Sequence, residues 1–163
     1  MEQHHYFVIA RAIHVLGVVL WIGGVAFVTT ILLPAIKQLT SPEKRLALFE
    51  QLESKFSFQA KFVTLATGIS GYVMLEIING WDRYLYPQFW WMHLMTLVWG
   101  IFTLVLFVLE PLFLHQWFHK KAAQDSEKTF RIVHIMHIVL LSLSLIAVAG
   151  ATVGSHGYTF IYG

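Results

Sequence analysis

Histidine is the residue type in this chain best able to do chemistry, and it occurs inside long apolar segments. Four histidines lie near the start of such segments: His14, His93, His134 and His137. An ionisable side chain within a membrane span is costly, so it usually faces the interior of the helix bundle and has a function. Imidazole is a common ligand for metal ions and for haem iron. These histidines are therefore the first candidates for a ligand site.

The segments that carry the histidines are long enough to cross a bilayer. A helix needs roughly 20 apolar residues to span the hydrocarbon core, and the segments at 7–33, 58–78, 89–114 and 132–153 meet that length. Only 12% of the residues are charged, against roughly 25% in a soluble domain. We therefore predict an all-α integral membrane protein, with residues 1–163 forming one domain. Its expected architecture is a four-helix, up-down-up-down bundle in the lipid bilayer.

The basic residues predict the orientation of this bundle, because they concentrate on the cytoplasmic side of membrane proteins. Nine of them lie in or beside two loops: Lys37, Lys44, Arg45, Lys55, Lys61, Lys120, Lys121, Lys128 and Arg131. The opposite side has only Arg11 and Arg83. We expect both termini on the outer, periplasmic side of a bacterial inner membrane. The aromatic-rich loop at 81–91 would then lie at the outer membrane interface.

Composition also excludes several classes of function. The chain has no cysteine, which excludes disulfides, thiolate metal sites, iron–sulfur clusters and haem attached by thioether bonds. The formal net charge of +2 is explained by membrane topology. No nucleic acid partner is expected.

Helical spacing gathers the small and polar residues of each segment on one face, which we expect to point into the bundle. On the third segment this face comprises His93, Thr96, Gly100, Thr103, Phe107 and Glu110. Four glycines on these faces either permit close helix packing or leave room for a flat cofactor: Gly17, Gly68, Gly71 and Gly100. For Glu110 we favour a structural pairing with Lys61 or Arg131 over a proton relay.

Depth in the membrane separates the histidines into two pairs. At a rise of 1.5 Å per residue, His14 lies about 9 Å outward of the middle of its helix, and His93 lies at a similar depth. The first and third helices of such a bundle sit diagonally opposite, so these two imidazoles can clamp a planar macrocycle. His134 and His137 lie in the inner half, level with Lys61. The sequence predicts an outer site and one possible inner site.

Two histidines suit a haem better than a bare metal ion. Bis-imidazole ligation gives a b-type haem suited to electron transfer, whereas zinc and copper(II) usually recruit three or four ligands. His156, just beyond the fourth segment, is the candidate third ligand at the outer level. Met92 and Met95 flank His93 and would suit copper(I), but successive helical residues diverge by about 100°. We interpret both methionines as packing residues.

The first segment resembles a known family. Residues 12–24, reading AIHVLGVVLWIGG, look like the first helix of the CopD-like and HemJ-like group of small four-helix membrane proteins. Residues 91–93, reading WMH, and the basic inner loops resemble that group too. A HemJ-like identity implies b-type haem and protoporphyrinogen oxidase activity, and the CopD label implies copper handling. The matching residues are His14 and His93. HemJ-like sequences tend to carry lysine where this chain has Met95.

The sequence-based hypothesis is a b-type haem protein that transfers electrons, with one or two haems and a quinone or redox protein as partner. His14 and His93 would ligate the outer haem iron. His137, or else His134, would ligate an inner one, with Lys61 as ligand or propionate partner. The alternatives are a copper transporter, a HemJ-like oxidase, and a structural subunit whose histidines join helices. A homo-oligomer is a possible assembly.

Overall fold

The computed structural model describes residues 2–38 and 41–157, without the side chains of residues 113–115 and 123. Apart from short connections, these residues are helical. The elements are α1 (Glu2–Phe27), the π-helical turn η1 (Val28–Leu32), α2 (Leu33–Lys37), α3 (Pro42–Ile77), the short 3-10 helices η2 (Gly80–Leu85) and η3 (Pro87–Phe89), α4 (Trp90–Leu104), the π-helical η4 (Val105–Leu114), α5 (His115–Gln124) and α6 (Ser126–Ser155).

Four helices are long and apolar enough to cross a membrane, which confirms the predicted class. They are Glu2–Lys37, Pro42–Ile77, Pro87–Leu112 and Ser126–Ser155. Most extend beyond the predicted spans. The second begins at Pro42 rather than near residue 58, because the Ser41 side chain accepts a hydrogen bond from the Lys44 amide and caps the helix there. The polar stretch before the membrane segment is therefore part of the same helix.

The first helix does not end at residue 33, just before Pro34, as the predicted span 7–33 did, but continues to Lys37. A π-helical turn precedes this proline, and in it the Leu33 amide donates to the Val28 carbonyl, five residues back. In the same register the Thr29 carbonyl would need the amide of Pro34, which has no N–H. The helix therefore continues to Lys37 but leaves the Thr29 carbonyl without a donor from its own backbone.

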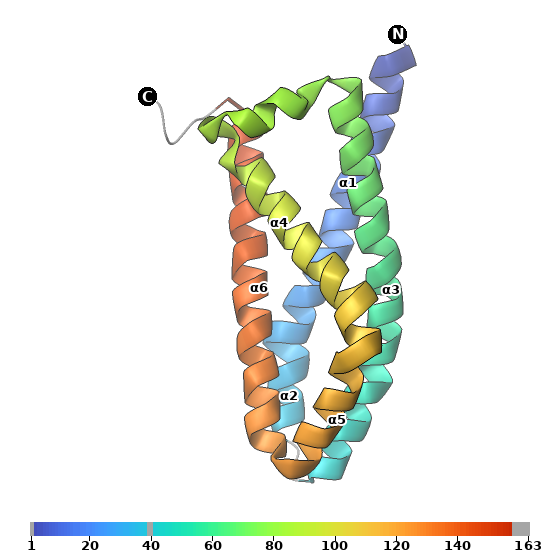
Figure 1. Cartoon of the computed structure of the whole chain (residues 1–163), viewed down its shortest axis with the longest axis vertical. Coiled ribbons are helices and arrows are strands. Elements are labelled where there is room, and N and C mark those ends of the chain that lie inside the picture. Colours follow the sequence, from blue (N-terminus) through green and yellow to red (C-terminus); the bar gives the residue numbers. More distant parts are fainter. Residues whose placement is uncertain (1, 39–40, 158–163) are drawn as a thin grey trace.

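The four long helices alternate in direction (Figure 1). α1 begins and α6 ends at one end of the molecule, which we call the terminal end. The α2–α3 and α5–α6 connections lie at the other end, the loop end. α1 packs along α3, while α4 leans across the molecule, against α6 near the terminal end and towards α3 lower down. Two helix pairs, α1/α3 and α4/α6, therefore make up the terminal half.

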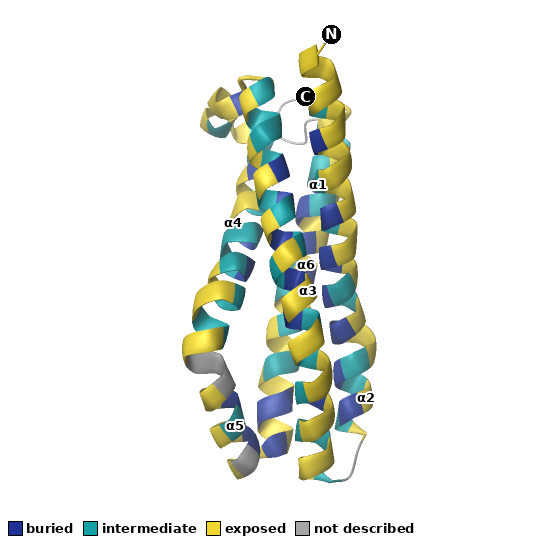
Figure 2. Ribbon diagram, turned by 90° about the vertical axis from the view of Figure 1, so that its right-hand side faces the viewer, coloured by how far each residue is buried: buried dark blue, intermediate teal, exposed yellow. Residues whose placement is uncertain are grey.

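Two apolar clusters join these helices. One lies at mid-length and consists of Trp21, Ile22, Val25, Val98, Phe102 and Leu141. The other lies near the loop end and consists of Val28, Leu33, Ile36, Phe49, Phe118, Ala122 and Phe130. Outward-facing positions along the helices are exposed (Figure 2), and many carry large apolar side chains. Such a surface suits contact with lipid tails.

The aromatic loop is partly a packing element rather than only an interfacial belt. Trp81 is exposed, as expected at a membrane interface, but Trp91 is only 7% exposed. The Trp91 ring lies directly against Gly154 of α6, and the Trp90 ring lies against Gly150. These two contacts hold the start of α4 on the end of α6.

Candidate functional site

His14 is held between α1 and α3 by a contact with the α3 backbone. Its Nδ1 lies 2.9 Å from the carbonyl oxygen of Thr67, and the Ser70 hydroxyl lies 3.4 Å from the same nitrogen. A carbonyl can only accept, so Nδ1 carries the hydrogen and Nε2 keeps the lone pair. A Cβ at Gly71 would lie 3.1 Å from the His14 ring, so glycine makes room for it. Metal-binding histidines typically have this arrangement, with one nitrogen donated to a carbonyl.

The other glycines divide between the two expected roles. A Cβ at Gly17 would overlap the Thr67 hydroxyl, and one at Gly68 would overlap the Trp99 ring. Both positions therefore serve close helix packing, and the space that was predicted for a cofactor is filled. A Cβ at Gly100 would meet nothing within 4 Å, so open space lies beside that glycine.

His93 lies on a face of α4 that is more open than the sequence suggests. His93 and Thr96 are exposed, whereas α4 buries Trp91, Met92, Val98 and Phe102. The prediction that this polar face points into the bundle is wrong for these two residues. Together with Tyr84 and Gly100, they line an open groove of about 590 Å³.

The groove orients the His93 ring by a backbone contact of its own. The Nε2 of His93 donates to the Tyr84 carbonyl at 2.9 Å, and the Tyr84 hydroxyl lies 2.7 Å from the Thr96 hydroxyl. The free lone pair of His93 is therefore on Nδ1, the reverse of His14. His14 is fixed between α1 and α3, whereas His93 is fixed between α4 and η2. Their predicted pairing stays a prediction.

His134 joins α6 to the irregular part of the first helix. Its Nε2 lies 2.9 Å from the Thr29 carbonyl, and its Nδ1 lies 2.7 Å from Nζ of Lys37. An ammonium group can only donate, so Nδ1 accepts and Nε2–H donates. The imidazole thus satisfies the carbonyl that Pro34 leaves without a donor. Both ring nitrogens are in use, which matches the expectation of a histidine that joins helices.

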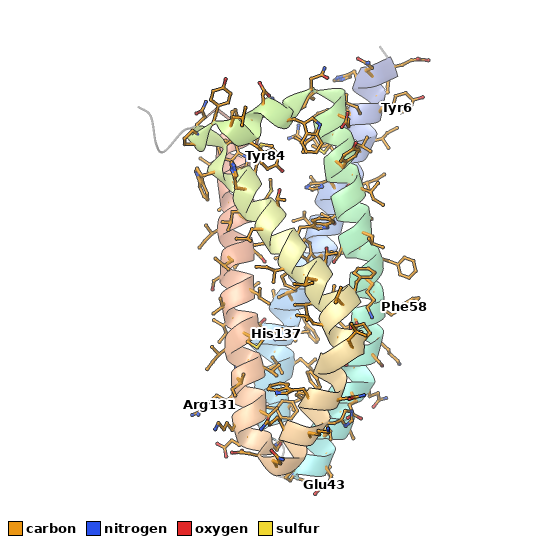
Figure 3. All side chains as sticks on the ribbon, viewed as in Figure 1. Tyr6, Glu43, Phe58, Tyr84, Arg131 and His137 are labelled. Carbon is orange, nitrogen blue, oxygen red and sulfur yellow. The ribbon has the colours of Figure 1, made fainter. Side chains whose placement is uncertain are left out.

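His137 repeats the nitrogen arrangement of His14 on a different helix. Its Nδ1 donates to the Val133 carbonyl one turn earlier, at 2.9 Å, which leaves the lone pair on Nε2. Figure 3 shows His137 on α6, well away from Tyr84 at the terminal end. The half-buried ring is thus a free candidate ligand in the loop half.

Lys61 is directed to the third span rather than to His137. Its Nζ lies 3.1 Å from Oε2 of Glu110, and the Ser57 hydroxyl donates to the same oxygen at 2.7 Å. The predicted pairing of Glu110 with Lys61 is confirmed. Among the described residues no contact joins Lys61 to His137 or His134, and the inner site that combined them stays a prediction.

A site with three or more ligands is not seen in the described part of the chain, where no group of three His, Asp or Glu side chains could hold a metal ion. Zinc and copper(II) sites usually need that many. The donor set available is one or two imidazoles, which is the number that a haem iron requires.

Known proteins give no independent assignment. No protein-family model, no curated protein and no solved structure matches the chain. The resemblance of its first and third spans to the CopD-like and HemJ-like group stays a resemblance, and the function must be argued from the residues and their contacts.

Proposed function

We propose that this chain is a multi-pass protein of the bacterial inner membrane that binds one b-type haem in its terminal half and transfers electrons. The terminal end would face the periplasm, in keeping with the distribution of basic residues. His14 would be an axial ligand through Nε2. The observation that carries this proposal is the contact between Nδ1 of His14 and the Thr67 carbonyl, at 2.9 Å, which orients the ring as metal-binding histidines are oriented.

The chain's own residues have definite roles in this proposal. The Thr67 carbonyl fixes the tautomer of His14 and increases the basicity of Nε2. Gly71 leaves the space in which the ring lies. A haem held in this way supplies one-electron transfer, and the surrounding apolar helices supply the low-dielectric environment that tunes its potential.

His93 fits as the second ligand under one condition. Its Nε2 is bonded to the Tyr84 carbonyl, so the ring must leave that carbonyl before Nε2 can ligate iron. His93 is exposed and faces the open groove, which gives the ring space to turn. We propose one haem rather than two. His137 keeps a free ring nitrogen, but the other two residues of the predicted inner site are engaged, His134 by Lys37 and the Thr29 carbonyl and Lys61 by Glu110.

The visible spectrum of the purified protein tests this proposal. Protein produced with ample haem should show a Soret band and, on reduction, sharp α and β bands. A colourless preparation would refute haem binding. His93→Ala should lose the low-spin bands of bis-imidazole iron. His156→Ala is the matched control, because among the described residues the hydrogen bonds of this exposed histidine go to Thr152 and Ser155 of its own helix. The spectrum of this variant should be unchanged.

A further inference from the structure

A row of aromatic rings crosses the terminal end of the molecule, from α3 towards α4. The centroids of the Tyr72 and Trp81 rings are 5.6 Å apart, and those of Trp81 and Tyr84 are 6.2 Å apart. The last ring, Tyr84, is fixed to α4, because its hydroxyl lies 2.7 Å from that of Thr96. Tyr72 and Trp81 are 55% and 46% exposed, so the start of the row is open to the surroundings. Tyrosine and tryptophan gather in this way where a membrane meets water.

The Glu76 carboxylate lies beside this row and forms no ion pair with a cationic side chain among the described residues. Its Oε1 accepts a hydrogen bond from Nε1 of Trp81 at 3.0 Å, and the Tyr72 hydroxyl also bonds to the carboxylate. Glu110, by comparison, is paired with Lys61 at 3.1 Å. Two aromatic donors thus hold Glu76 in place while its charge stays unpaired. A cation at this position would meet a carboxylate oxygen and aromatic rings, both of which attract it.

The groove on α4 begins where the aromatic row ends. Tyr84 belongs to both, because its ring stacks on that of Trp81 and also lines the groove. Further along α4 the lining is apolar and consists of Leu97, Gly100, Ile101 and Leu104. At a rise of 1.5 Å per residue, this apolar lining extends for about 10 Å towards mid-length of the bundle. The aromatic row, Glu76 and the groove therefore form one continuous surface.

This surface has the polarity that suits a phospholipid with a cationic headgroup. An anionic group and aromatic rings lie at the terminal end, and apolar side chains follow within the span. Leu97 and Leu104 are exposed, as expected of a groove that opens to the lipid bilayer. Tyr72 and Glu76 belong to α3, whereas the apolar lining belongs to α4. A single lipid on this surface would therefore contact both helix pairs of the terminal half.

We propose that a phospholipid with a primary amine in its headgroup, such as phosphatidylethanolamine, binds at the terminal end and joins α3 to α4. Its ammonium group donates to the Glu76 carboxylate and lies against the Tyr72 and Trp81 rings. One acyl chain lies in the apolar part of the groove, between Leu97 and Leu104. A primary ammonium suits the site better than a quaternary one, because only an N–H group can donate to a carboxylate. The proposal does not depend on haem.

Native mass spectrometry of the full chain tests the headgroup site. The protein is released from nanodiscs of phosphatidylethanolamine and phosphatidylcholine in equal amounts, with identical acyl chains, and should retain the former in preference. Glu76→Gln keeps an acceptor for Trp81 and Tyr72 but removes the charge, and should reduce this preference by about tenfold. Asp82→Asn is the matched control, because it removes the charge of an exposed acid next to Trp81, and it should keep the preference. Equal retention of the two lipids by the unmodified chain, or equal loss of preference in both variants, would overturn the headgroup site.

The acyl-chain site is tested by filling the groove. A Cβ at Gly100 or at Gly23 would meet no atom within 4 Å, so each position has room for a larger side chain, and of the two Gly100 lines the groove. Gly100→Leu should retain phosphatidylethanolamine about tenfold less than Gly23→Leu, which corresponds to about two methylene groups displaced. Equal retention by the two variants would overturn the acyl-chain site. Bound lipid is counted by mass, independently of the visible spectrum, so this proposal and the proposed function fail separately.

Discussion

His14 and His134 show how one residue type takes different roles in the two halves of the bundle. Both rings reach across to a backbone carbonyl of another helix, that of Thr67 or that of Thr29. His14 leaves Nε2 free for a ligand, whereas Lys37 takes the remaining nitrogen of His134. The difference teaches that an intramembrane histidine is a candidate ligand only if its second nitrogen has no structural partner.

The irregular first helix explains why the loop half needs His134. The π turn and Pro34 deprive the Thr29 carbonyl of its backbone donor. An unsatisfied carbonyl is costly in an apolar environment, and the imidazole supplies the missing N–H. Beside His14, by contrast, α3 is a regular helix. The Thr67 carbonyl therefore does not require the hydrogen bond from His14.

The largest effect on stability is therefore expected from His134→Ala. This change leaves the Thr29 carbonyl without a donor and Lys37 without its acceptor, and each loss costs about 1–3 kcal/mol. Thermal unfolding in detergent should show a marked loss of stability. His134→Gln, whose amide can both donate and accept, should recover part of it. Unchanged unfolding of His134→Ala would remove the distinction between the two halves.

The next effect compares glycines at a closed and an open position. A Cβ at Gly68 would overlap the Trp99 ring, so Gly68→Ala should cost about 1–3 kcal/mol through overpacking. The added Cβ of Gly100→Ala would meet no neighbour within 4 Å. The free energy of unfolding of this variant should rise by up to about 1 kcal/mol, because alanine has a higher helix propensity than glycine. Equal unfolding temperatures of the two variants would contradict the packing described here.

The smallest effect is expected at the Lys61–Glu110 ion pair. Glu110→Gln keeps an acceptor for both Ser57 and Lys61 but removes the charge. Polar contacts between membrane helices average about 0.6 kcal/mol, so the loss of stability should be near that value. Glu110→Leu removes the acceptor entirely and should destabilise the protein more. Identical unfolding of both variants would show that the contact itself contributes nothing.

The sequence predicted the four spans because bilayer thickness fixes the length of apolar helix required. It also singled out His14, whose role as a ligand stays a proposal. The exposed face of α4 was not predictable from periodicity, which groups residues on a face but does not say which neighbour covers that face. Here Trp91, Val98 and Phe102 are buried between the helices. α4 runs diagonally across the molecule (Figure 1), and His93 and Gly100 line the groove.

The role of His134 was missed for a different reason. In the π-helical register the Thr29 carbonyl would accept from the residue five positions later, which is Pro34 and has no N–H. This loss of a donor follows only if the helix continues past the proline. Ending the first span at residue 33, just before Pro34, concealed that signal. A proline within an apolar run that continues for a further turn would have indicated a carbonyl in need of a donor.

The account depends most on His14 as the haem ligand, and haem content per folded protein tests this most directly. His14→Ala and His134→Ala should be purified in parallel, with haem measured as the pyridine complex and normalised to the folded fraction. The account predicts that His14→Ala loses its haem while folded His134→Ala retains it. Full haem content in His14→Ala, or equal loss in both variants, would contradict it.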